Sequence, residues 1–318
     1  MKLVLPLRQH VGAPCTPVVQ VGDEVKRGQL IAKPAGHGAN IHASANGKIV
    51  EINENEIAIE AVGEINMDDY VRLTSEDHLS LIEEAGIVGA GGAGFPAHVK
   101  FKAKLEGGYI LANAAECEPL LAHNMHLLEN EPELVVRGIK YVMEITGATH
   151  GYIAIKPKHQ KAMISVAKAC KNVEGVEVKF LSDMYPAGDE RVIVRELLGV
   201  ELPLGALPSE ANAIISNVET LKNVTYAIEK KMPVITKDIT VGGRVAKPSV
   251  YREVPLGMEI KHYIDQSGGY VEPHGEIVLG GPFTGKHGEE SARIVKTLGG
   301  ILVAVPFPED HRKFGMIE

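Results

Sequence analysis

The sequence predicts a multidomain α/β protein, and three changes of pattern along its 318 residues lead to that expectation. Residues 1–62 carry short apolar runs between turns rich in Gly, Asp and Asn, as in an all-β domain. From residue 63 to 232, strand-like and helix-like segments alternate, which favours a parallel sheet covered by helices on both faces. Residues 233–290 combine a hairpin, a helix and a returning strand, and residues 291–318 are expected to form a C-terminal tail.

Composition narrows the classes of function. The formal net charge of −8 argues against a nucleic-acid partner. No apolar run approaches the ~20 residues of a membrane span, so direct membrane insertion is not expected. The N-terminus lacks the apolar core of a secretory signal, and the three widely spaced cysteines form no C-x-x-C motif. We therefore expect a cytoplasmic protein with no metal or iron–sulfur motif within this chain.

The N-terminal domain is predicted from two similar halves. Residues 18–25 and 29–32 are expected strands around a Gly-Asp turn, and residues 41–52 repeat the plan with Asn46-Gly47 as a hairpin turn. This pattern resembles the barrel-sandwich hybrid of biotinyl and lipoyl carrier domains. Those carriers expose a modified lysine on a hairpin, whereas the corresponding segment here, 34–40, has no lysine at its tip. A structural or docking role is therefore expected.

The central domain places polar residues where strands end. The expected strands are 109–113, 151–155 and 176–181, and the expected helices are 79–85, 133–146, 160–171, 189–198 and 210–228. In parallel sheets, ligands bind beyond the carboxyl ends of the strands. Asn113 and the segment 185–188 lie at such ends.

A glycine-rich stretch, Gly89–Pro96, precedes the first of these strands. Glycines allow a tight backbone path and a close approach of N–H groups to a ligand, and Lys100 follows within reach of a phosphate. The spacing G-x-G-x-x-G occurs here, but a helix-like segment precedes it and Phe-Pro follows it. We therefore reject the ordinary dinucleotide-binding fingerprint. A tight turn with a solvated lysine is the plain alternative.

The C-terminal part is predicted to be a small α+β unit. Residues 236–251 are expected to form a hairpin with a Lys-Pro turn, 257–266 a helix, and 277–282 a strand. This arrangement suggests a β-grasp domain. The segment 306–310 is expected to be a loop-like tail.

Four segments in order resemble one family, the RnfC-like proteins and the NADH-oxidising, FMN-binding subunit of respiratory complex I. The segments are Gly89–Pro96 with Lys100, Asn113–Pro119, Tyr185–Glu190 and Ser216–Leu221. The C-terminal unit is similar to the family's soluble-ligand-binding (SLBB) β-grasp domain, including Gly280-Gly281-Pro282, and Gln9–Pro14 resembles RnfC openings. Proteins of similar layout include PrdC, associated with proline reductase, and the cobalamin reductase PduS.

The resemblance implies a Rossmann-like central domain with noncovalent FMN and with NAD(H) as substrate. It implies electron transfer to iron–sulfur partners in a larger assembly, such as an Rnf-like complex or the proline reductase system, at the inner face of a membrane. It assigns Phe95, Glu118 and Glu190 to the nicotinamide nucleotide, with the two glutamates as the catalytic pair. The residues that it assigns to FMN are Gly89, Gly91, Gly92, Lys100, Asn113, Glu116, Tyr185, Gly188, Asp189 and Asn217.

This chain departs from the family at several positions. RnfC-like chains carry two four-cysteine cluster motifs after the β-grasp domain, so 4Fe-4S clusters are expected only in a missing C-terminal region or in a partner. Small residues stand at four positions that are polar in the complex I loops: Ala90, Ala97, Ala115 and Ser216. Two alternatives therefore stay open, a non-catalytic docking subunit and a cobalamin reductase of the PduS type.

Each acidic site candidate also has a simpler interpretation. Glu116, Glu118 and Glu190 could cap helix N-termini, where acidic residues are favoured. Cys117 could be a small buried apolar residue. No nucleophile–base arrangement is recognisable, and hydride transfer to a flavin needs none.

Overall fold

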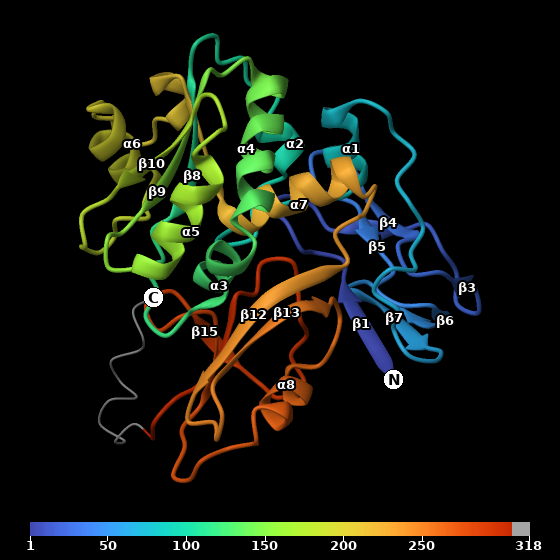
Figure 1. Ribbon diagram of the computed structural model, residues 1–318. Coiled ribbons are helices and arrows are strands. Elements are labelled where there is room, and N and C mark those ends of the chain that lie inside the picture. Colours follow the sequence, from blue (N-terminus) through green and yellow to red (C-terminus); the bar gives the residue numbers. More distant parts are fainter. Residues whose placement is uncertain (307–318) are drawn as a thin grey trace.

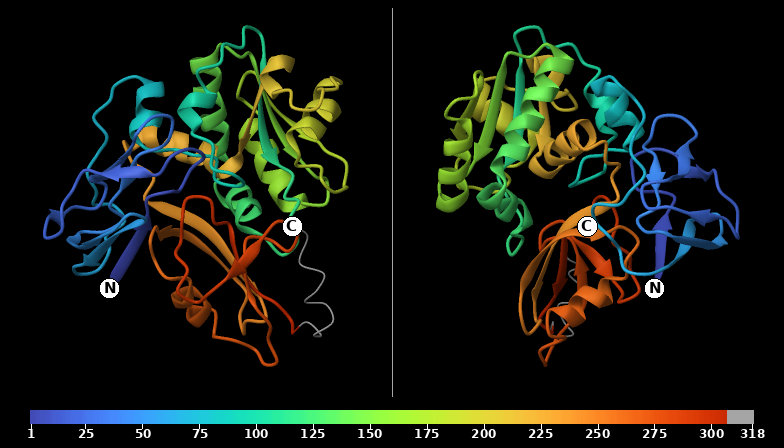
Figure 2. Two further views of the ribbon diagram at one scale, coloured as in Figure 1. Left: turned by 180° about the vertical axis from the view of Figure 1, so that it is seen from behind. Right: turned by 45° about the vertical axis from the view of Figure 1, so that its right-hand side comes forward.

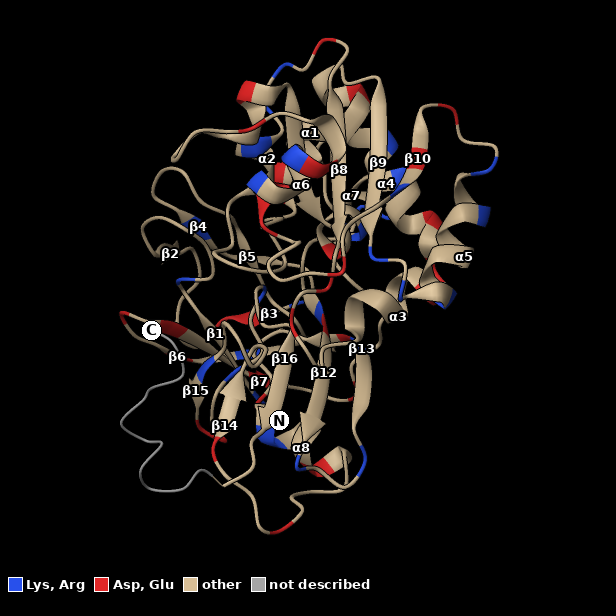
Figure 3. Ribbon diagram, turned by 90° about the vertical axis from the view of Figure 1, so that its left-hand side faces the viewer, with Lys and Arg blue, Asp and Glu red and all other residues tan. Residues whose placement is uncertain are grey.

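A computed structural model describes residues 1–306 as three bodies, shown in Figure 1. An N-terminal β body and a central α/β body lie side by side, and a C-terminal sheet lies against both, as the two further views in Figure 2 confirm. Lys and Arg are interspersed with Asp and Glu along the ribbon (Figure 3). No helix among the described residues has the length and apolarity needed to cross a membrane. Residues 307–318 of the expected tail lie outside the described residues.

The N-terminal body consists of two antiparallel sheets, which bury Leu3, Ile31 and Ile57 between them. Their strand orders are β1-β7-β6-β3 and β2-β4-β5. The bounds are β1 Lys2–Pro6, β2 Cys15–Pro17, β3 Glu24–Val25, β4 Leu30–Pro34, β5 Ile41–His42, β6 Gly47–Ile52 and β7 Glu56–Ala61.

Two expectations for this body were wrong. Asn46-Gly47 does not join a hairpin, because β5 pairs with β4 while β6 pairs with β3 and β7. Residues 18–25 supply only the two-residue strand β3, and the rest is turn. In a sandwich of two sheets, a strand's partner is set by which sheet buries its apolar side, and local turn residues do not report this.

The central body is a parallel sheet of order β10-β9-β8-β11. Helices α4, α5 and α7 share a core with one face, and α6 packs on the other around Ile193 and Val194. The strand bounds are β8 Tyr109–Ala114, β9 His150–Ile155, β10 Val176–Phe180 and β11 Ala213–Asn217. The helix bounds are α1 His78–Glu84, α2 Ala97–Lys100, α3 His123–Asn130, α4 Pro132–Thr146, α5 Gln160–Cys170, α6 Glu190–Leu198, the 3₁₀ helix η1 Pro208–Ala211, and α7 Val218–Glu229.

The expected helix over residues 210–228 was wrong in its first half. Residues 208–211 form η1, Asn212 turns the chain with a positive φ of 53°, and Ala213–Asn217 form strand β11 before α7 begins. Ala213, Ile214 and Ile215 are buried, and their short apolar run has no amphipathic alternation. Such runs do not distinguish a buried strand from a buried helix.

The C-terminal sheet has the order β13-β12-β16-β14-β15. Strand β16 lies at its centre, parallel to β12 and antiparallel to β14, so the expected tail from residue 291 contains a core strand. The Lys247-Pro248 turn of the expected hairpin is present between β12 and β13. The bounds are β12 Thr236–Gly243, β13 Ser249–Pro255, α8 Ile260–Gln266, β14 Ile277–Leu279, β15 Lys286–Gly288 and β16 Gly300–Val303.

One buried lysine joins all three bodies. The Lys296 ammonium donates to the backbone oxygens of Asn40 at 2.6 Å and Gly86 at 2.7 Å. Its own backbone N–H donates to the side chain of Gln9. Burial lowers the pKa of Lys296 to about 8. The contact at Gly86 fixes the chain just before the glycine-rich stretch begins.

Candidate cofactor-binding site

The carboxyl ends of β8 and β11 open onto a crevice with two adjoining cavities. The loop cavity, about 460 Å³, lies between the glycine stretch and the ends of these strands. The outer cavity, about 690 Å³, lies between the loop after β8 and the C-terminal sheet. Gly91, Gly92, Asn113, Gly188 and Asn217 line both, so they form one continuous space. Each volume falls in the range of small-molecule sites.

The glycine stretch forms a closed loop. The backbone N–H of Gly89 donates to the oxygen of Phe95 at 2.9 Å, and Val88 and Pro96 bridge at the base. The N–H of Ala90 donates to the Thr220 hydroxyl of α7 at 2.9 Å. Gly92 has a φ of 72°, a conformation that favours glycine, and the space around it is open. The loop therefore presents backbone rather than side chains to the cavity.

Lys100 ends the short helix α2 and points to the floor of the loop cavity. Its ammonium group lies 2.9 Å from a carboxylate oxygen of Glu190 and donates to the backbone oxygen of Ile215 at 2.8 Å. The side chains of Lys100 and Glu190 are 31% and 44% exposed, so the pair remains accessible to a ligand. The two residues thus act as one ion pair across the sheet rather than as separate groups.

Asn113 holds two loops together at the end of β8. Its amide nitrogen donates to the backbone oxygen of Gly188 at 3.0 Å, and its oxygen accepts from Ala115 N–H. The N–H of Gly188 in turn donates to Cys117 Sγ at 2.9 Å. A Cβ at position 188 would lie 3.1 Å from that sulfur, which is a tight contact, so the close approach favours glycine.

Glu116 is the acidic group of the crevice with the clearest change in proton affinity. Burial is the main cause that raises its pKa to about 7, and the nearby Glu118 adds to it. Asn124 of α3 opposes the rise by donating to its carboxyl at 3.2 Å. The backbone φ of Glu116 is positive at 34°, so the loop turns sharply at this residue.

Glu118 contacts the C-terminal sheet. One carboxylate oxygen accepts from Phe283 N–H at 2.9 Å, and the other accepts from Thr284 N–H at 2.8 Å and from the Thr284 hydroxyl. The ring of Phe283 meets that of Tyr185 edge-on, with centroids 4.7 Å apart. The turn between β14 and β15 therefore covers one side of the outer cavity.

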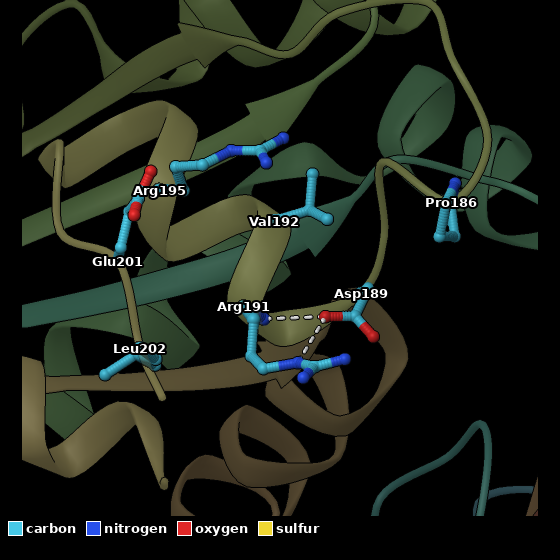
Figure 4. A pocket seen from close by; sticks show the side chains of 7 residues that line it. All are labelled: Pro186, Asp189, Arg191, Val192, Arg195, Glu201 and Leu202. Carbon is cyan, nitrogen blue, oxygen red and sulfur yellow. Dashed lines mark hydrogen bonds and ion pairs between the residues drawn. The ribbon is translucent and has the colours of Figure 1, made fainter. Parts of the chain in front are cut away.

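Asp189 begins α6 and faces a neighbouring hollow. Its carboxylate accepts from the Arg191 N–H at 2.9 Å, as an N-cap does, and lies 3.5 Å from the Arg191 side chain (Figure 4). Figure 4 shows Arg195 further along the same helix, beside Glu201. Asn217 is also an N-cap, because its side chain accepts from Glu219 N–H at 2.8 Å and opens α7.

The structure brings every residue assigned from the sequence to this crevice, in two groups. The group around the loop cavity comprises Gly89, Gly91, Gly92, Phe95, Lys100, Asn113, Gly188, Glu190 and Asn217. The group confined to the outer cavity comprises Glu116, Glu118, Tyr185 and Asp189.

Sequence reasoning missed the contribution of the C-terminal sheet. Thr284, Lys286, His287 and Arg293 line the outer cavity opposite the loop after β8. The sequence signal that the C-terminal sheet would reach the crevice was the glycine pair before Pro282, Gly280-Gly281. Thr220, which holds the glycine loop, was also missed.

The comparisons with known proteins divide the chain in the same way as the fold. Residues 82–226 match the Nuo51 FMN-binding domain, and residues 1–66 match the RnfC barrel-sandwich hybrid domain. The chain resembles, with 21% identity and a TM-score of 0.59, a structure of an NAD⁺-reducing [NiFe]-hydrogenase, over 72% of this chain and 46% of the other. At 21% identity, this similarity shows the fold alone.

Relatives with described functions match most of the chain. An RnfC-type protein of the proton-translocating ferredoxin:NAD(+) oxidoreductase complex of Clostridium ljungdahlii is 37% identical over 307 residues, covering 89% of this chain and 66% of the relative. Its counterpart in the Na(+)-translocating complex of Acetobacterium woodii is 32% identical over 302 residues, covering 89% and 68%. Cobalamin reductase PduS of Citrobacter freundii is 38% identical over 231 residues, covering 72% and 49%.

This chain therefore spans about two thirds of the two ferredoxin:NAD(+) oxidoreductase relatives and about half of PduS. The expected family is confirmed, and the chain belongs to the RnfC family of electron-transfer oxidoreductase subunits, with an FMN-binding domain of the complex I type.

Proposed function

We propose that this chain is the flavin-binding part of an electron-transfer subunit that exchanges electrons between NAD(H) and iron–sulfur partners through FMN. The observation that carries the proposal is the convergence of the glycine loop with the ends of β8 and β11 on one crevice. Ligands of parallel α/β sheets bind at such ends. The FMN-binding domain match over residues 82–226 covers all of these elements.

The residues present fit the cofactor. Gly91 and Gly92 leave space where side chains would otherwise project, as a planar or phosphorylated ligand requires. The crevice supplies an ammonium group at Lys100 and amides at Asn113 and Asn217. Such groups suit a phosphate and a polyhydroxyl chain. When bound, FMN supplies a ring that takes up hydride and releases single electrons.

Each residue then takes the role that the family resemblance assigns to it. Lys100 and the loop of Gly89, Gly91 and Gly92 bind the phosphate and ribityl end. Asn113, Glu116, Gly188 and Asn217 border the flavin ring, and Tyr185 and Asp189 stand beside it. Phe95, Glu118 and Glu190 border the nicotinamide nucleotide, with Glu190 also holding Lys100. The cavities support this proposal by bringing the residues to one crevice, and the division into phosphate, ring and nicotinamide contacts follows the family resemblance.

The remaining assignments concern the surroundings of this domain. We place 4Fe-4S clusters in a C-terminal region beyond this chain or in a partner, and the chain in an Rnf-like or related complex at the inner face of a membrane. The relatives of the same family, which are subunits of ion-translocating oxidoreductase complexes, support this. We assign residues 1–62, 63–232 and the C-terminal sheet to barrel-sandwich hybrid, Rossmann-like and SLBB β-grasp domains.

Flavin binding and NADH turnover test the proposal. The purified chain is titrated with FMN while flavin fluorescence is followed, and NADH oxidation is then measured with ferricyanide as acceptor. We expect saturable quenching at micromolar FMN and FMN-dependent turnover. A chain that fails to bind FMN, or binds it without any turnover, would favour the docking subunit instead.

The similarity to PduS supports one second candidate, corrinoid reduction. Adding cob(III)alamin to the FMN-loaded chain with NADH distinguishes it. Reduction of the corrinoid faster than that of ferricyanide would favour the PduS-type function, and no corrinoid reduction would exclude it for this chain.

A further inference from the structure

The turn between β14 and β15 reaches across from the C-terminal sheet to the loop after β8. Gly281 and Gly285 close this turn through a hydrogen bond of 2.9 Å between the N–H of Gly285 and the oxygen of Gly281. Its tip, Phe283-Thr284, is the part that touches the central body. Strand β14 pairs with β16 at the centre of the sheet and with β15, so the base of the turn is rigid.

Glu118 is held by this turn. Its carboxylate accepts three hydrogen bonds, from two successive backbone N–H groups and one hydroxyl, and both oxygens are used. Charged acceptors make stronger hydrogen bonds than neutral ones. Three of the roughly four lone-pair sites of the carboxylate then have donors, so the turn fixes the orientation of the Glu118 side chain.

Gly281 shows that the contact is close-packed. A Cβ at this position would overlap the carboxylate carbon and Oε2 of Glu118, whereas the φ of Gly281 lies outside the left-handed region that favours glycine. An alanine here would push the Glu118 carboxylate out of its present position. This gives a way to break the contact without altering Glu118.

The contact sets the position of the Phe283 ring beside the Tyr185 ring, and these two rings form an aromatic wall. With the turn held, the ring of Phe283 lies with its centroid 4.7 Å from that of Tyr185, although the two residues are 46% and 52% exposed. Tyr185 lines the outer cavity, and Thr284 lies beside it. Half-exposed aromatic rings at the edge of a cavity are suited to a planar heteroaromatic ligand.

We propose that Glu118 is a positioning residue that clamps the β14–β15 turn, so that Phe283 and Tyr185 together border the planar ring of a ligand in the outer cavity. This rests on the proposed function for the class of ligand, a nicotinamide or flavin ring. The clamp itself rests only on the contacts among Glu118, Gly281 and Phe283-Thr284.

The clamp is tested first without any ligand. Amide hydrogen exchange over residues 280–286 is compared in the wild-type chain and in the variants Glu118→Gln, Gly281→Ala and Thr284→Val. We expect exchange in this segment to rise by about tenfold in the first two and by less in the third, as the turn opens locally. Gly36→Ala is the matched control, because a Cβ there meets nothing within 4 Å. Unchanged exchange in both Glu118→Gln and Gly281→Ala would overturn the clamp, whatever the chain binds.

Kinetics then separate positioning from acid–base chemistry. If Glu118 acts through the turn, Glu118→Gln and Gly281→Ala raise the KM for NADH by about tenfold and change kcat by about twofold or less. Phe283→Ala does the same, whereas Phe180→Ala, at an exposed ring outside the crevice, does not. If Glu118 instead exchanges protons, its Gln variant loses kcat and changes the pH profile while Gly281→Ala behaves as wild type, which would refute the proposal.

Titrating the same variants with FMN shows whether Phe283 and Tyr185 border the flavin ring or the nicotinamide ring. Weaker FMN binding in Phe283→Ala assigns the wall to the flavin, and unchanged FMN binding with a raised KM assigns it to the nicotinamide. If the wild-type chain neither binds FMN nor oxidises NADH, the proposed function is refuted. The clamp is not refuted by that result, because hydrogen exchange tests it without any ligand.

Discussion

Lys100 and Glu190 form an ion pair at this crevice before any ligand binds. The Lys100 ammonium already has an acidic partner and a backbone acceptor. A phosphate that enters the loop cavity would therefore meet a lysine whose position is fixed. Preorganised charge costs less on binding than a free side chain does.

Replacing Lys100 should weaken flavin binding. We expect Lys100→Met to raise the dissociation constant for FMN by about tenfold, since a charge-assisted hydrogen bond to phosphate is worth about 1.5 kcal/mol or more. Fluorescence titration with FMN and with riboflavin, which lacks the phosphate, measures the effect. Lys102→Met is the control, because Lys102 is exposed. Equal losses for FMN and riboflavin would contradict a phosphate contact.

The raised pKa of Glu116 leads us to expect that the stability of the folded chain depends on pH. Its pKa rises from the ordinary 4.5 to about 7 in the folded chain, mainly through burial. Between these values the folded protein holds a proton that the unfolded chain has lost, so stability falls as pH rises from 4.5 to about 7.

We therefore expect Glu116→Gln to be more stable than wild type at high pH only. At pH 8 the gain in free energy of unfolding should be about 1–3 kcal/mol, and near pH 4 it should vanish. Urea denaturation across this pH range measures it, with Glu54→Gln at an exposed position as control. A gain that is the same at every pH would show that ionisation of Glu116 is not its cause.

Among the helices and strands, the junction of β11 and α7 does the most to build the site. β11 completes the parallel sheet beside β8, and its last residue, Asn217, is also the N-cap of α7. The first turn of α7 supplies Thr220, whose hydroxyl accepts a hydrogen bond from the glycine loop at Ala90 N–H. One strand–helix junction thus positions both walls of the loop cavity.

Substitutions of Asn217 should separate capping from ligand binding. Asn217→Ala should lower the free energy of unfolding by about 0.5–2 kcal/mol through loss of the cap, whereas Asn217→Asp should keep it. Both should weaken FMN binding, the second because it places a negative charge in the crevice that binds an anionic cofactor. Thermal melts and FMN titration measure the two effects.

Asp77→Ala provides the matching control. Asp77 caps α1 by accepting from Ser80 N–H, and it does not line the crevice. This variant should lose stability without losing FMN affinity. If Asn217→Asp binds FMN as wild type does, Asn217 acts only as a cap.

Across the whole molecule, buried charges connect the central body to the C-terminal sheet. Lys222 of α7 pairs with Asp238 of β12 at 2.7 Å, and both side chains are 1% exposed. Arg252 of β13 reaches the same carboxylate at 3.0 Å, and Lys237 pairs with Glu219. These pairs fix the C-terminal sheet, and hence the β14–β15 turn, relative to the crevice.

Removing one member of this network should be costly. We expect Lys222→Met to lower the free energy of unfolding by about 3–5 kcal/mol, because it leaves a buried carboxylate short of a partner. Lys2→Met, which breaks the exposed pair with Glu51, should lower the free energy of unfolding far less, because solvent screens that pair. Urea denaturation measures both, and similar losses for the two variants would show that burial does not govern the network.

The order of the structural parts could be predicted from the sequence because each has its own local signal. Helices α4, α5 and α6 have apolar periodicity, with a proline start or a glycine end in α4 and α6, and the structure confirms them close to their expected bounds. Strand β11 and strand β16 were missed for one reason. Both are short and buried, so their side chains carry no alternation between core and solvent.

The family and the residues gathered at the crevice could be predicted from the sequence, because four segments rich in glycine, amide and carboxylate residues resemble those of one known family in the same order. How two of those residues are engaged depends on the tertiary structure: Lys100 pairs with Glu190, and Glu118 binds a turn that lies far along the chain, at Phe283-Thr284. The physical reason is that a side chain's hydrogen-bond partner depends on which distant backbone groups folding brings within about 3 Å, and no local pattern encodes that distance.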